Sequence, residues 1–227
     1  MKLLRRIRNS FGALQILYRL SGFINLFCPR FDREQNRALR RQAVLPAGML
    51  NGQAVPPLAA LPYGAWRMEK NGCEVIAVYN ALLALDMPRP FFEVADALEE
   101  KGLLFNGFGG TALGAVEDYL RKSGVSVRVL RGKDAAAYDA ALENADCAVL
   151  SFWTGAALRE RDGTWNTLHT VFVRKTAAGT EIRNDGGHCA APRRIASVGQ
   201  YLSANGAAPV CFMLLRKEIP AENAKNA

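Results

Sequence analysis

The run at residues 73–86 is the feature that most constrains how this chain folds. It reads CEVIAVYNALLALD, which has the length of a helix and is apolar on most sides. A helix without a polar face is expected to be buried by other elements. Pro88 and Pro90 follow it and set its end. The rest of the chain therefore has to build a core around this helix.

The segments after the buried helix predict more helices first and strands afterwards. Residues 91–101 and 111–120 carry apolar side chains at helical spacing, with Thr111 as an N-cap and Gly124 after the end. Two short helices are expected at 134–144 and 197–204, and strands at 125–129, 147–153, 169–176, 180–185 and 209–216. This order indicates an α+β fold, with a helical first half and an antiparallel sheet in the second half.

Basic residues gather at the start of the chain. The 227 residues are half hydrophobic, enough for one sizeable core, and their formal net charge is +8. The early basic residues are Lys2, Arg5, Arg6, Arg8, Arg19, Arg30, Arg33, Arg37, Arg40 and Arg41. Such a segment suits an anionic membrane surface, nucleic acid or an acidic partner. No recognised nucleic-acid-binding module or interleaved aromatic residues accompany it, so no nucleic acid is expected.

Residues 1–41 are predicted to form a basic amphipathic helical segment. One apolar stripe runs along it through Leu4, Ile7, Phe11, Leu14 and Tyr18. The segment is expected to pack on the main domain, to lie on a membrane surface, or to bind another protein chain. Its apolar stretch is interrupted by Arg19, which favours neither a secretory signal nor a membrane-spanning helix.

Three further regions complete the predicted organisation. Residues 42–65 are rich in Pro and Gly and are expected to be a linker or an extended arm. Residues 66–217 form the main domain, and residues 218–227 are expected to be a disordered tail.

The cysteine and histidine counts exclude several classes of site. There are five cysteines and two histidines, and no C-x-x-C pair occurs. The odd number and wide spacing of the cysteines argue against a disulfide framework and a zinc site. No metal or other cofactor is expected, and reduced thiols fit a cytoplasmic protein, which residues 1–41 could hold at a membrane surface.

Cys73 stands at the first turn of the buried helix, where two interpretations compete. Backbone N–H groups at a helix start lack partners, and the positive end of the helix dipole favours a thiolate. The preceding Asn71-Gly72 lets the backbone turn sharply and approach a substrate. Free cysteines are also often small core residues, as Cys147 and Cys211 inside predicted strands illustrate. Position favours a reactive thiol at residue 73.

His169 is the candidate base for such a thiol. It begins a strand, and the following hairpin places residue 169 opposite about residue 186 if the turn is centred near Ala178. Asn184 or Asp185 would then lie alongside the imidazole and hold its useful tautomer. A structural histidine and a plain turn at 185–187 are the alternatives, and His188 is the fallback base.

Together these residues resemble the papain-like cysteine peptidases, most of all the bacterial bacteriocin-processing (double-glycine leader) peptidases. The resemblance lies in NGCEVIAVYNAL (71–82), LHTVFV (168–173) and IRND (182–185), and it covers residues 62–216. It implies a papain-like catalytic domain and a thiol protease or other amide hydrolase with a peptide or protein substrate. By the same resemblance Cys73 is the nucleophile, His169 the general base and then acid, and Asp185 the orienting residue, with Asn184 as its alternative.

The sequence departs from that family at two positions beside the thiol. The family's oxyanion-binding glutamine, six residues before the cysteine, is replaced by Arg67. Asn71, Gln53 and Arg67 itself are the candidates to bind the oxyanion in its place. Glu74, directly after the cysteine, would oppose formation of the thiolate.

Two other functions remain open on the same fold. One is an acyltransferase or transglutaminase-like enzyme, because an amine can also attack a thioester. The other is a non-catalytic descendant that binds peptides. In any of these, substrate specificity is expected from the loops at 103–110 and 154–167.

Overall fold

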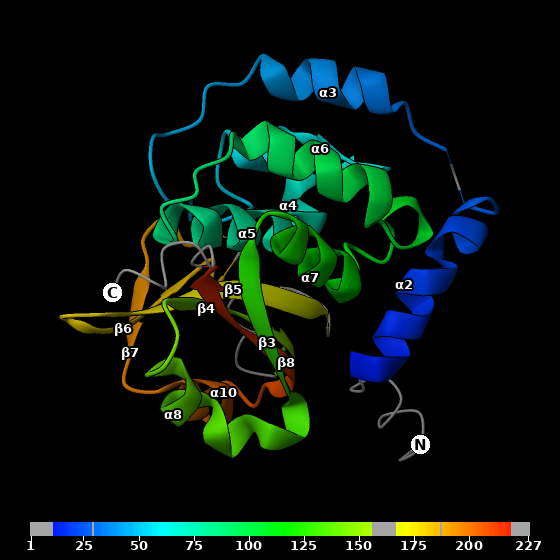
Figure 1. Ribbon diagram of the computed structural model, residues 1–227. Coiled ribbons are helices and arrows are strands. Elements are labelled where there is room, and N and C mark those ends of the chain that lie inside the picture. The colour runs from blue at the N-terminus through cyan, green and yellow to red at the C-terminus, as the bar shows by residue number, and fades with distance from the viewer. Residues whose placement is uncertain (1–10, 29, 156–166, 187, 219–227) are drawn as a thin grey trace, which may run out of the picture.

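A six-stranded antiparallel sheet dominates the second half of the described chain (Figure 1). The computed structural model describes residues 11–28, 30–155, 167–186 and 188–218. Strand order in the sheet is β3-β8-β4-β5-β6-β7. The strands are β3 (Val125–Arg131), β4 (Cys147–Trp153), β5 (Leu168–Thr176), β6 (Gly179–Arg183), β7 (Arg193–Ile195) and β8 (Ala208–Lys217). The predicted α+β class with an antiparallel sheet is confirmed.

Helices cover both faces of this sheet (Figure 1). The α-helices are α2 (Phe11–Asn25), α3 (Arg33–Arg41), α4 (Met68–Asn71), α5 (Cys73–Ala84), α6 (Phe91–Lys101), α7 (Leu113–Lys122), α8 (Tyr138–Leu142) and α10 (Val198–Ala204). Three 3₁₀ turns, η1 (Leu58–Ala60), η2 (Phe105–Gly107) and η3 (Gly132–Ala137), and a small hairpin of β1 (Pro62–Tyr63) and β2 (Trp66–Arg67) connect them. Helices α5, α6 and α7 lie on one side of the sheet, and α8 and α10 on the other.

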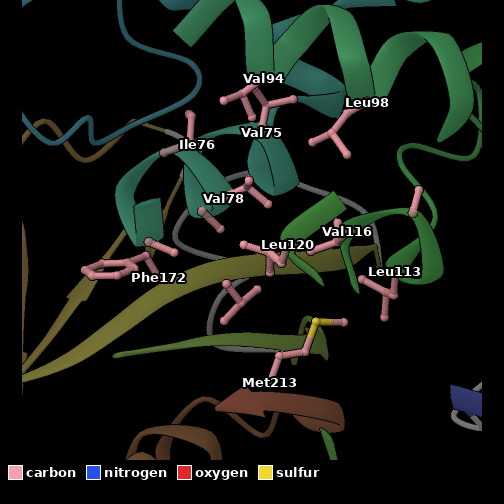
Figure 2. Packing of buried hydrophobic residues seen from close by; sticks show 14 of the residues in the cluster. Val75, Ile76, Val78, Val94, Leu98, Leu113, Val116, Leu120, Phe172 and Met213 are labelled. Atoms are coloured by element: carbon pink, nitrogen blue, oxygen red, sulfur yellow. The ribbon is translucent and has the colours of Figure 1, made fainter. Parts of the chain in front are cut away.

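Alternation of side chains along the strands divides the core into two clusters. On β4, Val149 belongs to the cluster under α5, whereas Leu150 belongs to the cluster that contains Tyr138 of α8 and Tyr201 of α10. Figure 2 shows part of the first cluster, with side chains from α5, α6 and α7 above the sheet and Phe172 of β5 beside those of α5. Both faces of the central strands are therefore buried.

Helix α5 is buried along its length, as its apolar sequence predicts. Val75, Ile76, Val78 and Leu82 have no exposed surface. The buried Asn80 is satisfied by the backbone of Leu50, because its side chain accepts from the N–H and donates to the C=O, each at 2.8 Å. The helix ends at Ala84, two residues before the predicted end.

The Pro- and Gly-rich stretch at residues 42–65 is an arm that packs along the main domain. Leu50, Leu58, Leu61 and Tyr63 place their side chains in the core. Because the arm contacts α5 and contains strand β1, it is held to the main domain over much of its length.

The described part of residues 1–41 packs on the main domain. Phe11 of α2 is buried in the core, and Tyr18 Oη donates to Asp118 of α7 at 3.0 Å. Helix α3 lies alongside α6 (Figure 1). The predicted apolar stripe begins at Leu4 and Ile7, which lie outside the described residues.

A buried arginine joins α3 to α6. Arg40 has no exposed side-chain surface, and its Nη1 and Nη2 donate to Glu99 Oε1 and Oε2 at 2.9 and 2.8 Å. The same carboxylate accepts from Asn36 Nδ2 at 2.8 Å and from the Gly64 N–H at 2.7 Å. Arg40 Nη2 also forms an ion pair with the carboxylate of Asp96. This paired and hydrogen-bonded geometry is what a buried charge requires.

The structure also differs from the sequence-based elements at the start of α7, over residues 134–144 and at β7. Helix α7 is capped by Ala112 rather than by Thr111, whose hydroxyl instead bonds Tyr63 Oη at 2.8 Å. The segment expected as one helix at 134–144 is a 3₁₀ turn followed by the short α8. Strand β7 was not predicted at all.

No helix in the described residues has both the length and the apolar character needed to cross a bilayer.

We predict that Arg40→Ala destabilises the protein by about 3–5 kcal/mol, because it leaves the Glu99 carboxylate buried without its cation. Urea unfolding followed by circular dichroism measures the change. Arg41→Ala is the matched control, since Arg41 is exposed and its loss should cost less than about 0.5 kcal/mol. Equal effects of the two substitutions would contradict a structural role for the buried pair.

Candidate active site

The turn before α5 presents Cys73 at the start of the buried helix. Helix α4 ends at Asn71, Gly72 is the N-cap of α5, and Cys73 is its first residue. A Cβ on Gly72 would lie 2.7 Å from the Met68 carbonyl oxygen, so this close turn requires glycine. The Cys73 side chain itself is 4 % exposed.

The thiol belongs to a chain of buried polar groups between α5 and the sheet. Cys73 Sγ donates to Glu74 Oε2 at 3.1 Å, and Glu74 Oε1 accepts from Thr170 Oγ1 at 3.2 Å. Thr170 Oγ1 also lies 2.9 Å from Ser151 Oγ on β4. Thr170 follows His169, the candidate base, on β5.

Electrostatics hold this thiol in its neutral form. Burial raises the pKa of Cys73 well above its ordinary value, and the neighbouring Glu74 carboxylate raises it further. Hydrogen bonding from the Thr170 backbone acts in the opposite direction. Burial also raises the pKa of Glu74 from 4.5 to about 7. The prediction that Glu74 opposes the thiolate is confirmed.

His169 is held by the strand that returns from the hairpin. Its Nε2 lies 2.6 Å from the main-chain carbonyl oxygen of Asn184, and its ring packs edge-on against Phe152 at 5.8 Å between centroids. A carbonyl oxygen can only accept a hydrogen bond, so Nε2 carries the proton. In the neutral imidazole this leaves the lone pair on Nδ1, which is the nitrogen able to act as a base.

Asn184, one of the two residues predicted to orient His169, contacts the imidazole through its main-chain carbonyl. Asn184 has φ 62° and directs its carbonyl to the imidazole, while its side-chain Nδ2 donates to Gln53 Oε1 at 3.0 Å. The Asp185 carboxylate accepts from Tyr201 Oη and from Arg193 Nη1, the latter at 3.1 Å. The main-chain carbonyl of Asn184, rather than its side chain, thus contacts the imidazole, and the orienting role expected of Asp185 stays a prediction.

The three oxyanion candidates occupy different positions. Arg67 is exposed on β2, and its side chain enters no ion pair or hydrogen bond with the described residues. The amide of Gln53 bridges Asn184 and the turn before Cys73, where Nε2 donates to the Glu69 carbonyl at 2.9 Å. Asn71 is 8 % exposed, and its Nδ2 has no hydrogen-bond partner among the described residues. Of the three candidates, Asn71 thus has a buried N–H donor that is available to bind an oxyanion.

The loop at 103–110 lies next to this unpartnered donor. A Cβ built on Gly107 would be 3.3 Å from Asn71 Nδ2, and the Ala65 N–H donates to the Asn106 carbonyl at 2.9 Å. Phe108 of the loop packs edge-on against Trp66, and both rings are exposed. The second predicted cleft wall, 154–167, lies largely outside the described residues. His188, the fallback base, is exposed beyond β6.

Several residues of the site were not found from the sequence. Thr170 contacts Glu74, Asn51 Oδ1 accepts from the Asn184 N–H at 2.7 Å, and Tyr201 and Arg193 hold Asp185. For Thr170 the signal was available, because it adjoins His169 and faces α5 by strand alternation. Asn51 contacts a residue 133 positions away and had no such signal.

The described contacts place a thiol and an unpartnered amide donor at the start of α5, and an imidazole on β5 beside the residue that contacts Glu74. All five cysteines are free, and Cys147 and Cys211 are buried in the core. Comparison with protein-family models and with curated proteins finds no match.

We predict that Glu74 makes the stability of the protein fall as pH rises from about 4.5 to 7. The folded state holds the Glu74 proton up to about pH 7, while the unfolded chain releases it near 4.5. Between those values the folded state binds more protons, so the stabilisation present at acid pH is lost, by about 3 kcal/mol in total.

Glu74→Gln removes this titration, so the difference in unfolding free energy between wild type and variant should change across the window. Urea unfolding of both proteins between pH 4.5 and 8 measures it. A difference that stays constant with pH would contradict the raised pKa of Glu74.

The same substitution is predicted to make Cys73 more reactive. Removing the neighbouring carboxylate lowers the pKa of the thiol, and each unit of lowering raises the thiolate fraction about tenfold. Alkylation of Cys73 by iodoacetamide at neutral pH, followed by peptide mass spectrometry, should be several-fold faster in Glu74→Gln. Glu69→Gln, which changes a carboxylate that makes no contact with the sulfur, should leave the rate unchanged.

Proposed function

We propose that this chain is a papain-like cysteine amide hydrolase that acts on peptide or protein substrates. The observation that supports it best is the meeting of α5 and β5. Cys73 begins the buried helix, and its sulfur is hydrogen-bonded by the Thr170 backbone. His169 precedes Thr170 on β5, and its Nε2 is hydrogen-bonded to the Asn184 carbonyl. The proposed nucleophile, base and orienting carbonyl come from three segments, α5, β5 and the end of β6.

Each group has a defined role in the proposed acyl transfer. Nδ1 of His169 takes the thiol proton as Cys73 Sγ attacks the substrate carbonyl carbon. The resulting oxyanion is bound by the Cys73 backbone N–H and Asn71 Nδ2. His169 then gives its proton to the leaving amine, which breaks the amide bond and leaves a thioester. Water, deprotonated by the same imidazole, hydrolyses the thioester and regenerates the thiol.

Gln53 and Asn51 support this site by positioning rather than by contact with substrate. Gln53 exchanges two hydrogen bonds with the Asn184 side chain, at 2.9 and 3.0 Å, and ties it to the turn that leads to Cys73. Asn51 accepts from the Asn184 N–H. These contacts fix Asn184 in its left-handed conformation, which in turn aims the carbonyl at His169.

A non-catalytic peptide-binding protein on the same fold is the second candidate. It is favoured by the hydrogen bond from the Cys73 thiol to Glu74, which keeps the sulfur protonated, and by the exposed Arg67 at the position of the family's glutamine. In this case the loop at 103–110 and the exposed Trp66 and Phe108 would bind peptide without cleaving it.

Labelling of Cys73 by a peptidyl epoxide tests the proposal. We predict that the wild-type protein is labelled at Cys73 in preference to its other cysteines, and that His169→Ala slows this labelling by at least about a hundredfold. His188→Ala is the matched control, because this exposed histidine should not affect the rate. Labelling at equal rates in wild type and His169→Ala would favour the non-catalytic candidate. Cleavage of a peptide library with and without an amine acceptor separates hydrolysis from acyl transfer.

Asn71→Ala is predicted to lower kcat by about 10²–10³ with little change in KM, because the donor acts on the oxyanion rather than on bound substrate. Steady-state hydrolysis of the best library peptide measures both constants. Arg67→Ala should change kcat by less than about threefold, since this side chain is exposed. A greater loss in Arg67→Ala than in Asn71→Ala would instead assign the oxyanion to the arginine.

A further inference from the structure

The whole formal charge of the protein resides in its first 41 residues. Ten of the 29 basic and two of the 21 acidic residues fall there, which gives +8 for this segment, while residues 42–227 carry 19 of each sign. Arg37, Arg40 and Arg41 lie within ion-pair distance of carboxylates of α6. The remaining cations are not needed to neutralise the main domain.

Helix α2 carries an exposed apolar stripe within this basic segment. Five large side chains on it and on the turn that follows are 50–77 % exposed: Ile16, Leu20, Phe23, Leu26 and Phe27. Four of them recur at spacings of four, three and four, which places them on one face. Phe23 and Phe27 pack edge-on at 5.3 Å between centroids. We call these five residues the α2 stripe.

The α2 stripe is held away from the main domain by the opposite face of the helix. Gln15 Nε2 donates to Glu117 at 3.2 Å, Tyr18 Oη donates to Asp118, and Asn25 Nδ2 donates to the Leu103 carbonyl at 2.8 Å. Gly114 of α7 permits this close approach, because a Cβ there would lie 2.2 Å from Gln15 Oε1. With one face fixed on α7, the stripe cannot turn inward without losing these contacts.

Cations flank the α2 stripe. Arg19 is exposed on α2 next to Leu20 in sequence, and Arg30 and Arg33 are exposed just after the stripe ends. Arg19 and Arg33 line one open cleft with Lys101, together with one carboxylate, that of Glu100. The four basic residues at positions 2–8 add to the charge in sequence.

We infer that the α2 stripe docks on an anionic lipid bilayer, with α2 lying parallel to its surface. Phe and Leu side chains enter the boundary between headgroups and acyl chains, and the surrounding arginines bind lipid phosphates. A second copy of the chain is disfavoured as the occupant, because it would bring two segments of charge +8 together. The inference does not depend on the function proposed for Cys73.

Co-sedimentation of the full chain with vesicles tests the inference. We expect binding to phosphatidylcholine vesicles that contain about 30 mol % phosphatidylglycerol, little binding to phosphatidylcholine alone, and weakening at about 0.5 M salt. Phe23→Ser with Phe27→Ser should lower the apparent affinity at least tenfold. Val44→Ser, which changes a side chain that is 88 % exposed outside the stripe, should bind like wild type.

Two outcomes would overturn it. One is equal loss of binding in the Val44→Ser control and in the double variant. The other is the absence of binding to either type of vesicle. Analytical ultracentrifugation would then show whether the protein is monomeric or self-associates through Phe23 and Phe27, and either result contradicts the inference. Leu20→Gln provides a second variant of the stripe should the double variant fold poorly, and circular dichroism verifies the fold of each.

Discussion

Burial of α5 is the constraint on which the rest of this structure depends. A helix with apolar residues on nearly every side is stable only when other elements exclude water from all of them. The sheet covers it from one side, α6 and α7 from another, and the arm supplies backbone groups for Asn80. Because packing fixes the helix along its length, it also fixes the position of Cys73. The hydrophobic core thus determines where the candidate site lies, and polar contacts determine the orientation of its side chains.

The sequence predicted the parts of the site that depend on local patterns. The apolar run located α5, and alternation with a turn near Ala178 located the hairpin of β5 and β6. The observed pairing of Phe172 with Arg183 and of Thr176 with Gly179 matches the register that was expected to bring residues near 185 beside His169. A local turn determines such a register, so a sequence read by itself is enough to find it.

The remaining parts depend on contacts between distant segments. The positive φ of Asn184, which aims its carbonyl at His169, follows from bonds to Asn51 and Gln53, more than 130 residues away in the chain. Nothing in the residues around 184 indicates that its backbone rather than its side chain meets the imidazole. Strand β7 was missed for a related reason, since RRI is short and polar and is held as an edge strand by pairing with β6.

Glu74 couples the titration of the thiol to that of a carboxyl group 3.1 Å away. Below about pH 7 both groups are protonated, and above it the pair holds a single proton. That proton resides mostly on sulfur, because burial and the carboxylate both disfavour the thiolate. In a fraction of these singly protonated molecules the proton lies on Glu74, and Cys73 is then a thiolate. This fraction does not change with pH, because the thiol form and the thiolate form of the pair contain the same number of protons. An isolated cysteine gains thiolate tenfold per pH unit up to its pKa. Over the pH range in which the pair holds one proton, Cys73 should instead keep a low and constant thiolate fraction, so that its reactivity depends on how neighbouring groups, His169 or a bound substrate, shift that proton.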